Sequence, residues 1–137
     1  MLLSIKHLAT FVGMWVLFIV IDLFWLGFVM RDFYMEALAR KARIIDGVLA
    51  PHWPASLAVW FLIVFGIFFF VLPLADSWLR AGIYGAVYGL ILYGVYDLTN
   101  FATLQDWPIK LVMADCVWGI LLNAVISAIS YKVLQFI

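Results

Sequence analysis

The chain has 137 residues, of which 69% are hydrophobic and 12% are charged. A soluble domain is nearer half apolar, and one of this size cannot bury so much apolar surface in its own core. We therefore expect the chain to lie in a lipid bilayer. Eight basic and eight acidic side chains give a formal net charge of zero, so no basic field for nucleic acid exists and no nucleic-acid partner is expected.

Four segments are long and apolar enough to cross a membrane as helices, which takes about 20 residues. They cover residues 8–30, 53–75, 79–98 and 109–134. The first is longer than the apolar core of a signal peptide and precedes no small-residue cleavage site, so we expect it to be retained. Because a backbone in hydrocarbon must satisfy its own hydrogen bonds, the sequence predicts an all-α, up-down four-helix transmembrane bundle, with residues 1–137 as a single integral membrane domain.

The segment between the first two spans, residues 31–52, mixes apolar with charged side chains. That pattern is typical of a short amphipathic helix lying in the membrane interface. We expect this helix to end at Asp46-Gly47, with Ile45 still on its apolar face. Two roles remain open for it: a solvated connector between two spans, or a lid over a substrate.

Alternate crossing of the bilayer puts both termini on one side, here called side A. The loops after the first and third spans then lie on the opposite side, side B. Side A holds three basic side chains and side B holds five, so the positive-inside rule weakly favours side B as the cytoplasmic side.

Three aspartates fall near side B: Asp22 late in the first span, Asp97 at the end of the third and Asp115 early in the fourth. At 1.5 Å per residue, Asp22 lies about 12 Å and Asp115 about 9 Å from its helix end. An aspartate in a spanning helix costs about 2.5–3.5 kcal/mol on insertion scales. We expect a polar cavity open to side B. The alternative is that each carboxyl accepts hydrogen bonds from neighbouring helices and only fixes their packing.

Sequence neighbours of the three acids suggest a common site. The first and fourth spans contain D-L-F-W-L-G and D-C-V-W-G, each with a tryptophan three residues after the acid. In the third span the acid shares its helix face with small residues, which let helices approach closely, so it should face protein. The predicted ligand-binding residues are Asp22, Trp25, Tyr93, Asp97, Thr99, Asn100, Asp115 and Trp118.

Several chemistries are excluded by residue type. The two histidines, His7 and His52, fall on opposite sides of the membrane, which argues against a bis-histidine haem or a histidine-rich di-iron site. His52 and Ser56 are four residues apart, but Pro54 intervenes and no acid nearby in sequence would orient a nucleophilic pair. The single Cys116 cannot form an intramolecular disulfide. Oxygen-rich groups remain, which suit hard cations, protons or amine-bearing headgroups. Spacing indicates neither a metal site nor a cofactor.

The stretch Y-G-x-Y-D-L-T-N-x-A-T-L-x-D-W-P, followed by A-D-x-x-W-G and preceded by an early D-x-x-W-L-G, resembles a known family. It is similar to small bacterial inner-membrane proteins, the domain-of-unknown-function family 2177, over nearly the whole chain. The resemblance implies a multi-pass four-helix protein of the bacterial inner membrane and supplies no activity. It is carried by Tyr96, Asp97, Thr99, Asn100, Thr103, Asp106, Trp107, Asp115, Trp118 and Gly119.

Three functions fit these observations. The leading one is a binding or transport protein whose side-B cavity takes a cationic or polar small ligand, such as a lipid headgroup. An accessory subunit of a larger membrane complex, with the acids serving as packing contacts, is the first alternative. The second is a lipid-modifying enzyme that uses the carboxylates as acid and base, with catalytic residues that the sequence does not name. Expected partners are the bilayer, a bound lipid or cation, and further copies or subunits.

Overall fold

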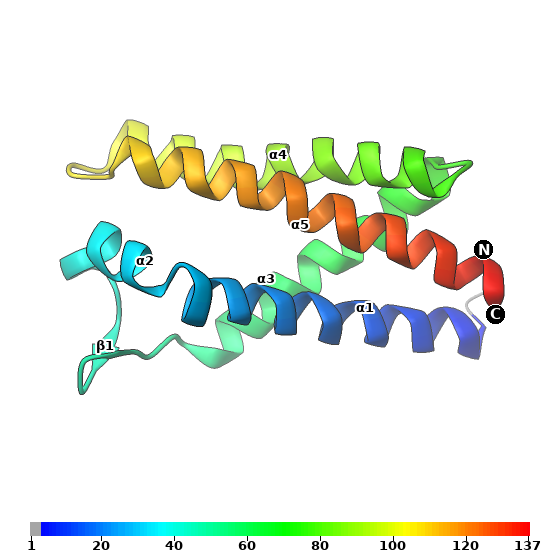
Figure 1. Ribbon diagram of the computed structural model, residues 1–137, viewed down its shortest axis with the longest axis horizontal. Coiled ribbons are helices and arrows are strands. Elements are labelled where there is room, and N and C mark those ends of the chain that lie inside the picture. Colours follow the sequence, from blue (N-terminus) through cyan, green and yellow to red (C-terminus); the bar gives the residue numbers. More distant parts are fainter. Residues whose placement is uncertain (1–3) are drawn as a thin grey trace.

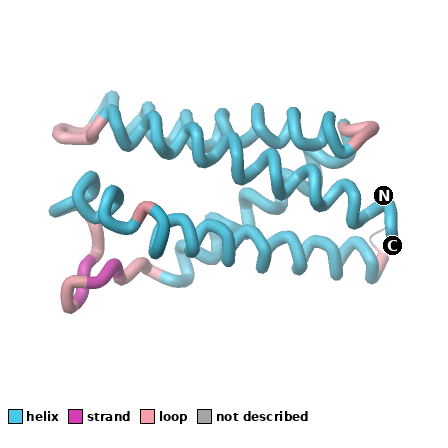
Figure 2. The backbone as a smooth tube through the Cα atoms, viewed as in Figure 1, coloured by secondary structure: helices cyan, strands magenta, loops and turns pink. Residues whose placement is uncertain are grey.

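The computed structural model describes residues 4–137 as four long helices with short connections (Figures 1 and 2). Each of the four is long and apolar enough to cross a membrane. The predicted all-α four-helix bundle is therefore confirmed. The spanning helices run over Ile5–Val29, Trp53–Leu74, Trp78–Thr103 and Ile109–Phe136.

Two of the four spans change helix type along their length. The first begins as an α-helix and ends in a π-helical turn, and the second passes through a π-helical and then a 3₁₀ turn. Such π turns are often found at functional sites, and the first one directly follows Phe24, close to Asp22. The elements are α1 (Ile5–Phe24), η1 (Trp25–Val29), α3 (Trp53–Gly66), η3 (Ile67–Val71), η4 (Leu72–Leu74), α4 (Trp78–Thr103) and α5 (Ile109–Phe136).

The third span is longer than predicted, because α4 continues past Leu98 to Thr103. The Thr103 hydroxyl donates to the carbonyl oxygen of Thr99 at 2.8 Å, and the backbone N–H of Leu104 donates to Asn100 O at 2.8 Å. Local hydrogen bonds of this kind let polar residues remain in a helix. Thr99 and Asn100 are thus helical, and the chain turns only after them.

The connection between the first two spans starts with the expected amphipathic helix, α2 (Arg31–Leu38), followed by a 3₁₀ turn, η2 (Ala39–Lys41). The prediction that this helix continues to Asp46-Gly47 is wrong. Those two residues instead form the turn of a small hairpin between β1 (Ile44–Ile45) and β2 (Val48–Leu49). Both have positive φ, 51° and 74°, the conformation that a two-residue Asp-Gly hairpin turn requires. Ile45 therefore lies on a strand.

The closest helix pair is α4 and α5, which lie side by side along the bundle (Figure 1). Glycines make this approach possible: a Cβ on Gly89 would collide with the carbonyl oxygen of Gly119, and one on Gly85 with the Ser127 hydroxyl. Small residues at the interface are the usual means of close helix contact in membranes. α1 packs on both α3 and α5, which closes the bundle on that side.

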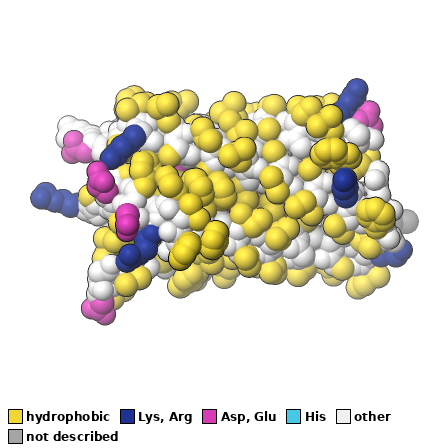
Figure 3. Space-filling model, in the orientation of Figure 1, with side chains coloured by type: hydrophobic (Ala, Val, Ile, Leu, Met, Phe, Trp, Pro, Cys, Tyr) yellow, Lys and Arg dark blue, Asp and Glu magenta, His cyan; other side chains and the backbone are white. Residues whose placement is uncertain are grey.

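Charged side chains gather at the two ends of the long axis, and the belt between them is largely hydrophobic (Figure 3). The start of α1 and the end of α5 lie at one end, where the Lys6 ammonium donates to the backbone carbonyl of Ile137. At the opposite end Lys41 Nζ donates to the carbonyl oxygen of Asp106 at 2.8 Å, joining the first and third loops. This distribution matches a bundle whose middle lies in hydrocarbon and whose ends meet water.

Candidate functional site

A cavity of about 560 Å³ lies in the side-B half of the bundle. Its wall is drawn from all four spans and from the first loop. Aliphatic side chains form about half of the wall, and the rest is aromatic or acidic. The acidic and aromatic lining residues are Asp22, Asp115, Tyr34, Tyr88, Tyr93, Tyr96, Trp60, Trp107 and Trp118.

Asp22 joins three helices at the cavity wall. Its side chain is buried, and its two carboxylate oxygens each accept one indole N–H. Trp60 Nε1 of α3 donates to Oδ2 at 2.7 Å, and Trp118 Nε1 of α5 donates to Oδ1 at 2.8 Å. Both donors are neutral, so they stabilise the carboxylate without compensating its charge.

Asp115, early in α5, is bound by a residue of the first loop. The Tyr34 hydroxyl of α2 donates a hydrogen bond to Asp115 Oδ1, and Trp25 Nε1 donates to the same Tyr34 hydroxyl oxygen at 3.3 Å. Burial of the phenol, followed by its hydrogen bond to Asp115, raises the pKa of Tyr34 well above its ordinary value. The phenol therefore keeps its proton and remains a donor to the carboxylate across the neutral pH range.

Asp97 is fully buried behind the cavity wall. Its Oδ1 accepts from Trp107 Nε1 at 3.3 Å, and its carboxyl lies close to that of Asp115. Its Oδ2 has no N–H or O–H donor among the described residues. Two carboxyl groups this close are not both ionised unless a proton or a cation offsets their charge.

The two acid–tryptophan motifs of the first and fourth spans face each other. The indole rings of Trp25 and Trp118 stack with centroids 4.1 Å apart and planes at 3°. Each indole serves the acid of the opposite motif: Trp118 donates to Asp22 directly, and Trp25 reaches Asp115 through Tyr34. The similarity of the two segments thus corresponds to a crosswise arrangement around one stacked pair of rings.

The eight predicted ligand-binding residues fall into three groups. Four of them line the cavity: Asp22, Tyr93, Asp115 and Trp118. Two lie directly behind it, since Trp25 stacks on Trp118 and Asp97 lies close to Asp115. The remaining two, Thr99 and Asn100, are outside the wall. Thr99 is exposed and Asn100 is half-buried. Within residues 4–137 no group of three acidic, cysteine or histidine side chains is arranged to hold a metal ion.

Sequence reasoning missed several lining residues, above all Tyr34 and Trp60. The position of Trp60 could have predicted a polar partner. It lies in the middle of a span, where an indole N–H needs an acceptor because no water can provide one. The sequence around Tyr34 is less informative, since this tyrosine lies among charged neighbours on a helix that could equally lie on the membrane surface. Its partner Asp115 is 81 residues away in sequence.

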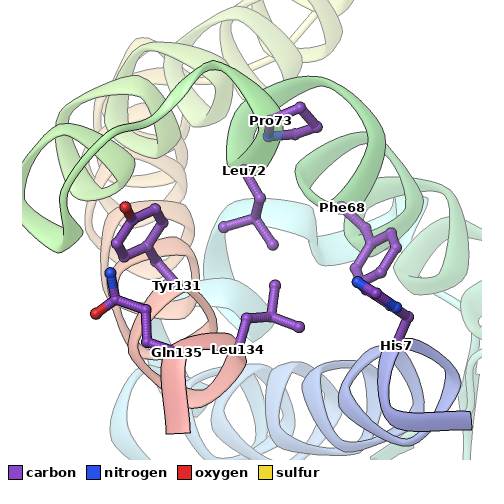
Figure 4. A pocket seen from close by; sticks show the side chains of 7 residues that line it. All are labelled: His7, Phe68, Leu72, Pro73, Tyr131, Leu134 and Gln135. Atoms are coloured by element: carbon purple, nitrogen blue, oxygen red, sulfur yellow. The ribbon is translucent and has the colours of Figure 1, made fainter. Parts of the chain in front are cut away.

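A second, smaller hollow of about 210 Å³ lies at the side-A end, lined by residues near the start of α1 and the end of α5 (Figure 4). Leu72 and Leu134 point into it, and His7 packs edge-on against Phe68 with ring centroids 6.2 Å apart. No carboxylate occurs among its described lining residues. The side-B cavity is therefore the candidate functional site.

Four apolar spans with charged ends define a multi-pass integral membrane protein. The chain belongs to a protein family described as "Predicted membrane protein (DUF2177)", which matches residues 7–132. This confirms the family resemblance carried by the Asp97 and Asp115 segments. A search of curated proteins and a search of solved structures both found no match.

Proposed function

We propose that the protein binds a cationic small ligand of the amine class in its side-B cavity. The observation that carries this proposal is the charge of the wall: it includes the carboxyls of Asp22 and Asp115, and no lysine, arginine or histidine occurs among its described lining residues. A negative site with no basic partner in low-dielectric surroundings favours a positively charged occupant.

Aromatic rings around the acids support the same ligand class. Four tyrosines and three tryptophans belong to the described wall. A cation over such a ring gains about 0.5–2 kcal/mol, more where water is excluded. Acids and rings together are the combination that recognises an ammonium group, whereas an anionic ligand would be repelled by the two carboxyls.

Acid–base chemistry on the bound ligand is a second candidate function. It is favoured by one observation, the closeness of the wall residue Asp115 to both Asp97 and the Tyr34 hydroxyl. A proton held among these three groups could pass to or from a ligand at the wall, as general acid–base catalysis requires. Turnover of an amine-bearing lipid by the purified protein, lost in Asp115→Asn, would support this candidate over simple binding.

We also propose the bacterial inner membrane as the location, with side B toward the cytoplasm. Support comes from the family resemblance and from five basic side chains near side B against three near side A. Labelling of single cysteines introduced at Arg43 and at Asp76, from outside intact cells, tests the orientation. Only the position-76 cysteine should react.

The binding proposal is tested with two probes of matched size, n-butylamine and n-butanol, on purified protein in dodecyl maltoside. We expect butylamine, which is positively charged at neutral pH, to raise the thermal unfolding midpoint, and butanol to leave it unchanged. Asp22→Asn and Asp115→Asn should each abolish the butylamine effect, because asparagine keeps the shape and removes the charge.

Asp106→Asn is the matched control, since Asp106 is an exposed loop acid outside the cavity wall. It should respond to butylamine like the original protein. Equal shifts with butanol, or an undiminished butylamine effect in both cavity variants, would contradict the proposal. Circular dichroism and size-exclusion chromatography establish that each variant is folded.

A further inference from the structure

One side of the cavity is open between α3 and α4. α3 itself packs on α1, and it is the following turn, η3, that packs on α4. Figure 1 shows α3 crossing the bundle obliquely, so that it separates from α4 toward side B. The Tyr88 hydroxyl donates to the carbonyl oxygen of Ile63 at 3.3 Å, which marks where the two helices still meet.

Residues on both edges of this gap line the cavity and are exposed at the same time. Val59 is 54% exposed, Leu62 64% and Tyr96 60%. A lining residue with so much exposed surface marks the place where a cavity reaches the outside. The opening therefore lies on the lateral surface of the bundle, between α3 and α4.

The depth of this opening decides what it faces. Along the tilted α3, Val59 lies about 9 Å and Leu62 about 14 Å from Trp53, the first residue of the helix, at 1.5 Å per residue. Their depth below the side-B end is somewhat less than these distances, because α3 is oblique to the bundle axis. A hydrocarbon core is about 30 Å thick. The opening thus faces acyl chains, and a molecule that passes through it comes from the bilayer.

The side-B end of the cavity is covered by the first loop. Tyr34 and Leu38 of α2 and Leu49 of β2 belong to its wall. The loop is fixed by the Tyr34–Asp115 hydrogen bond and by an ion pair of Lys110 Nζ with Glu36 Oε1 at 3.0 Å. Access from water at this end is restricted by α2, whereas access from the bilayer is unobstructed by it.

We infer that the ligand is a long-chain amine, with its ammonium group at Asp22 and Asp115 and its hydrocarbon chain in the gap between α3 and α4. This inference rests on the proposed amine-binding function and specifies the ligand class and its route. Asp22 lies about 10 Å from the end of its span and Asp115 about 9 Å from the start of α5. The carboxyls and the opening are at similar depth, so head and chain can occupy the site together.

Four probes separate the contributions of charge and chain: dodecylamine, n-butylamine, dodecanol and dodecanoate. Retention of each by the full chain in dodecyl maltoside is measured by native mass spectrometry. At equal free aqueous concentration, we expect dodecylamine to bind at least about tenfold more tightly than butylamine, since removal of even two further methylenes from water is worth about that factor. Dodecanol and dodecanoate should be retained at least about tenfold more weakly than dodecylamine.

The route is tested by filling the opening with a large side chain. Val59→Trp narrows the opening and leaves both carboxyls in place, so it should weaken dodecylamine binding about tenfold more than it weakens butylamine binding. Val87→Trp is the matched control. Val87 on α4 is 53% exposed, nearly the same fraction as Val59, and it lies outside the cavity wall. Should Val59→Trp fail to fold, Leu62→Trp at the same opening takes its place.

The outcomes distinguish this inference from the proposed function. If butylamine binds as tightly as dodecylamine and the tryptophan variants change neither, the lateral route is overturned and amine binding stands. Absence of binding by both amines overturns both. Dodecanol retained as strongly as dodecylamine would also overturn the inference, because the carboxyls would then contribute nothing to selection.

Discussion

The α4–α5 pair is in backbone contact through its glycines, whereas α3 and α4 separate toward side B and leave a cavity between them. The same helix, α4, takes part in both arrangements. It presents Gly85 and Gly89 to α5, and Tyr88 and Tyr96 to the cavity. In a bilayer, apolar surface alone does not draw helices together. The size of the side chains on each face of α4 therefore decides whether the neighbouring helix packs closely or remains at a distance.

Polar groups follow the same division. Between α4 and α5, Asn123 Nδ2 donates within its own helix to Gly119 O at 2.8 Å, and the buried Ser127 hydroxyl has no partner among the described residues. Around the cavity they bond between helices, as Trp60 and Trp118 do to Asp22. The close pair is therefore held by shape and the open region by hydrogen bonds. Substitutions in the two regions should therefore change the unfolding free energy by different amounts and for different physical reasons.

The largest effect is expected for Gly89→Ala, which puts a methyl group against the carbonyl oxygen of Gly119. Backbone atoms cannot move aside as a flexible side chain can, so we expect a loss of about 3 kcal/mol in unfolding free energy, as in overpacked cores. Denaturant titration in detergent measures it. Gly13→Ala is the control, since a Cβ there meets no atom within 4 Å. Equal stability of the two variants would refute the close-contact account.

A smaller loss, about 2 kcal/mol, is expected for Trp60→Phe. It leaves Asp22 Oδ2 without its indole donor, and a buried acceptor left unpaired costs about 1–3 kcal/mol. Trp53→Phe, at the exposed start of the same helix, should cost little. We also expect faster hydrogen exchange in α3 of the Trp60 variant alone. An unchanged unfolding midpoint would mean that α3 is held by other contacts.

Tyr34→Phe tests how the first loop is attached to the bundle. The ring remains and only the hydroxyl is lost, so Asp115 loses one donor and we expect a cost of about 1.5 kcal/mol. Hydrogen exchange should become faster in α2 and not in α4. Met35→Leu, on the same helix and outside the cavity wall, is the control. Unchanged α2 protection in Tyr34→Phe would contradict this attachment.

The pH dependence of the same contact has a definite sign. Because the folded-state pKa of Tyr34 is raised above the unfolded value, its contribution is complete below the ordinary tyrosine pKa and is lost only as pH rises through the folded value. At a pH just above the ordinary pKa, tyrosinate absorbance should therefore be the same for Tyr34→Phe and the original protein. Lower absorbance in the variant would show that Tyr34 ionises normally.

The smallest effect is expected for Glu36→Gln, which removes the ion pair with Lys110. Both side chains are more than half exposed, and exposed pairs of this kind contribute about 0–1 kcal/mol. The unfolding midpoint should change by less than a degree or two and the protection of α2 should persist. A loss of unfolding free energy as large as that of Tyr34→Phe would mean that the surface ion pair contributes as much to holding the loop as the buried hydrogen bond does.

The sequence by itself determined the four spans and the side of the membrane on which the acids lie. Span number follows from length and hydropathy, which are local properties. Alternate crossing then brings Asp22, Asp97 and Asp115 toward one end, whatever the details of packing. The amphipathic helix after the first span was also readable, although its end was not. Asp46 and Gly47 both have positive φ, as their hairpin turn requires, and a helix cannot continue through residues in that conformation.

Only the tertiary structure decided which side chains share the cavity. Spans that are apolar all round carry little sign of which face points inward, so rotation of each helix about its axis could not be read from the pattern. That rotation puts Asp115 on the wall and Asp97 behind it, leaves Thr99 outside, and brings Trp60 to Asp22. Side-chain hydrogen bonds between distant segments and close contacts at glycine set these positions, and both depend on how the helices cross.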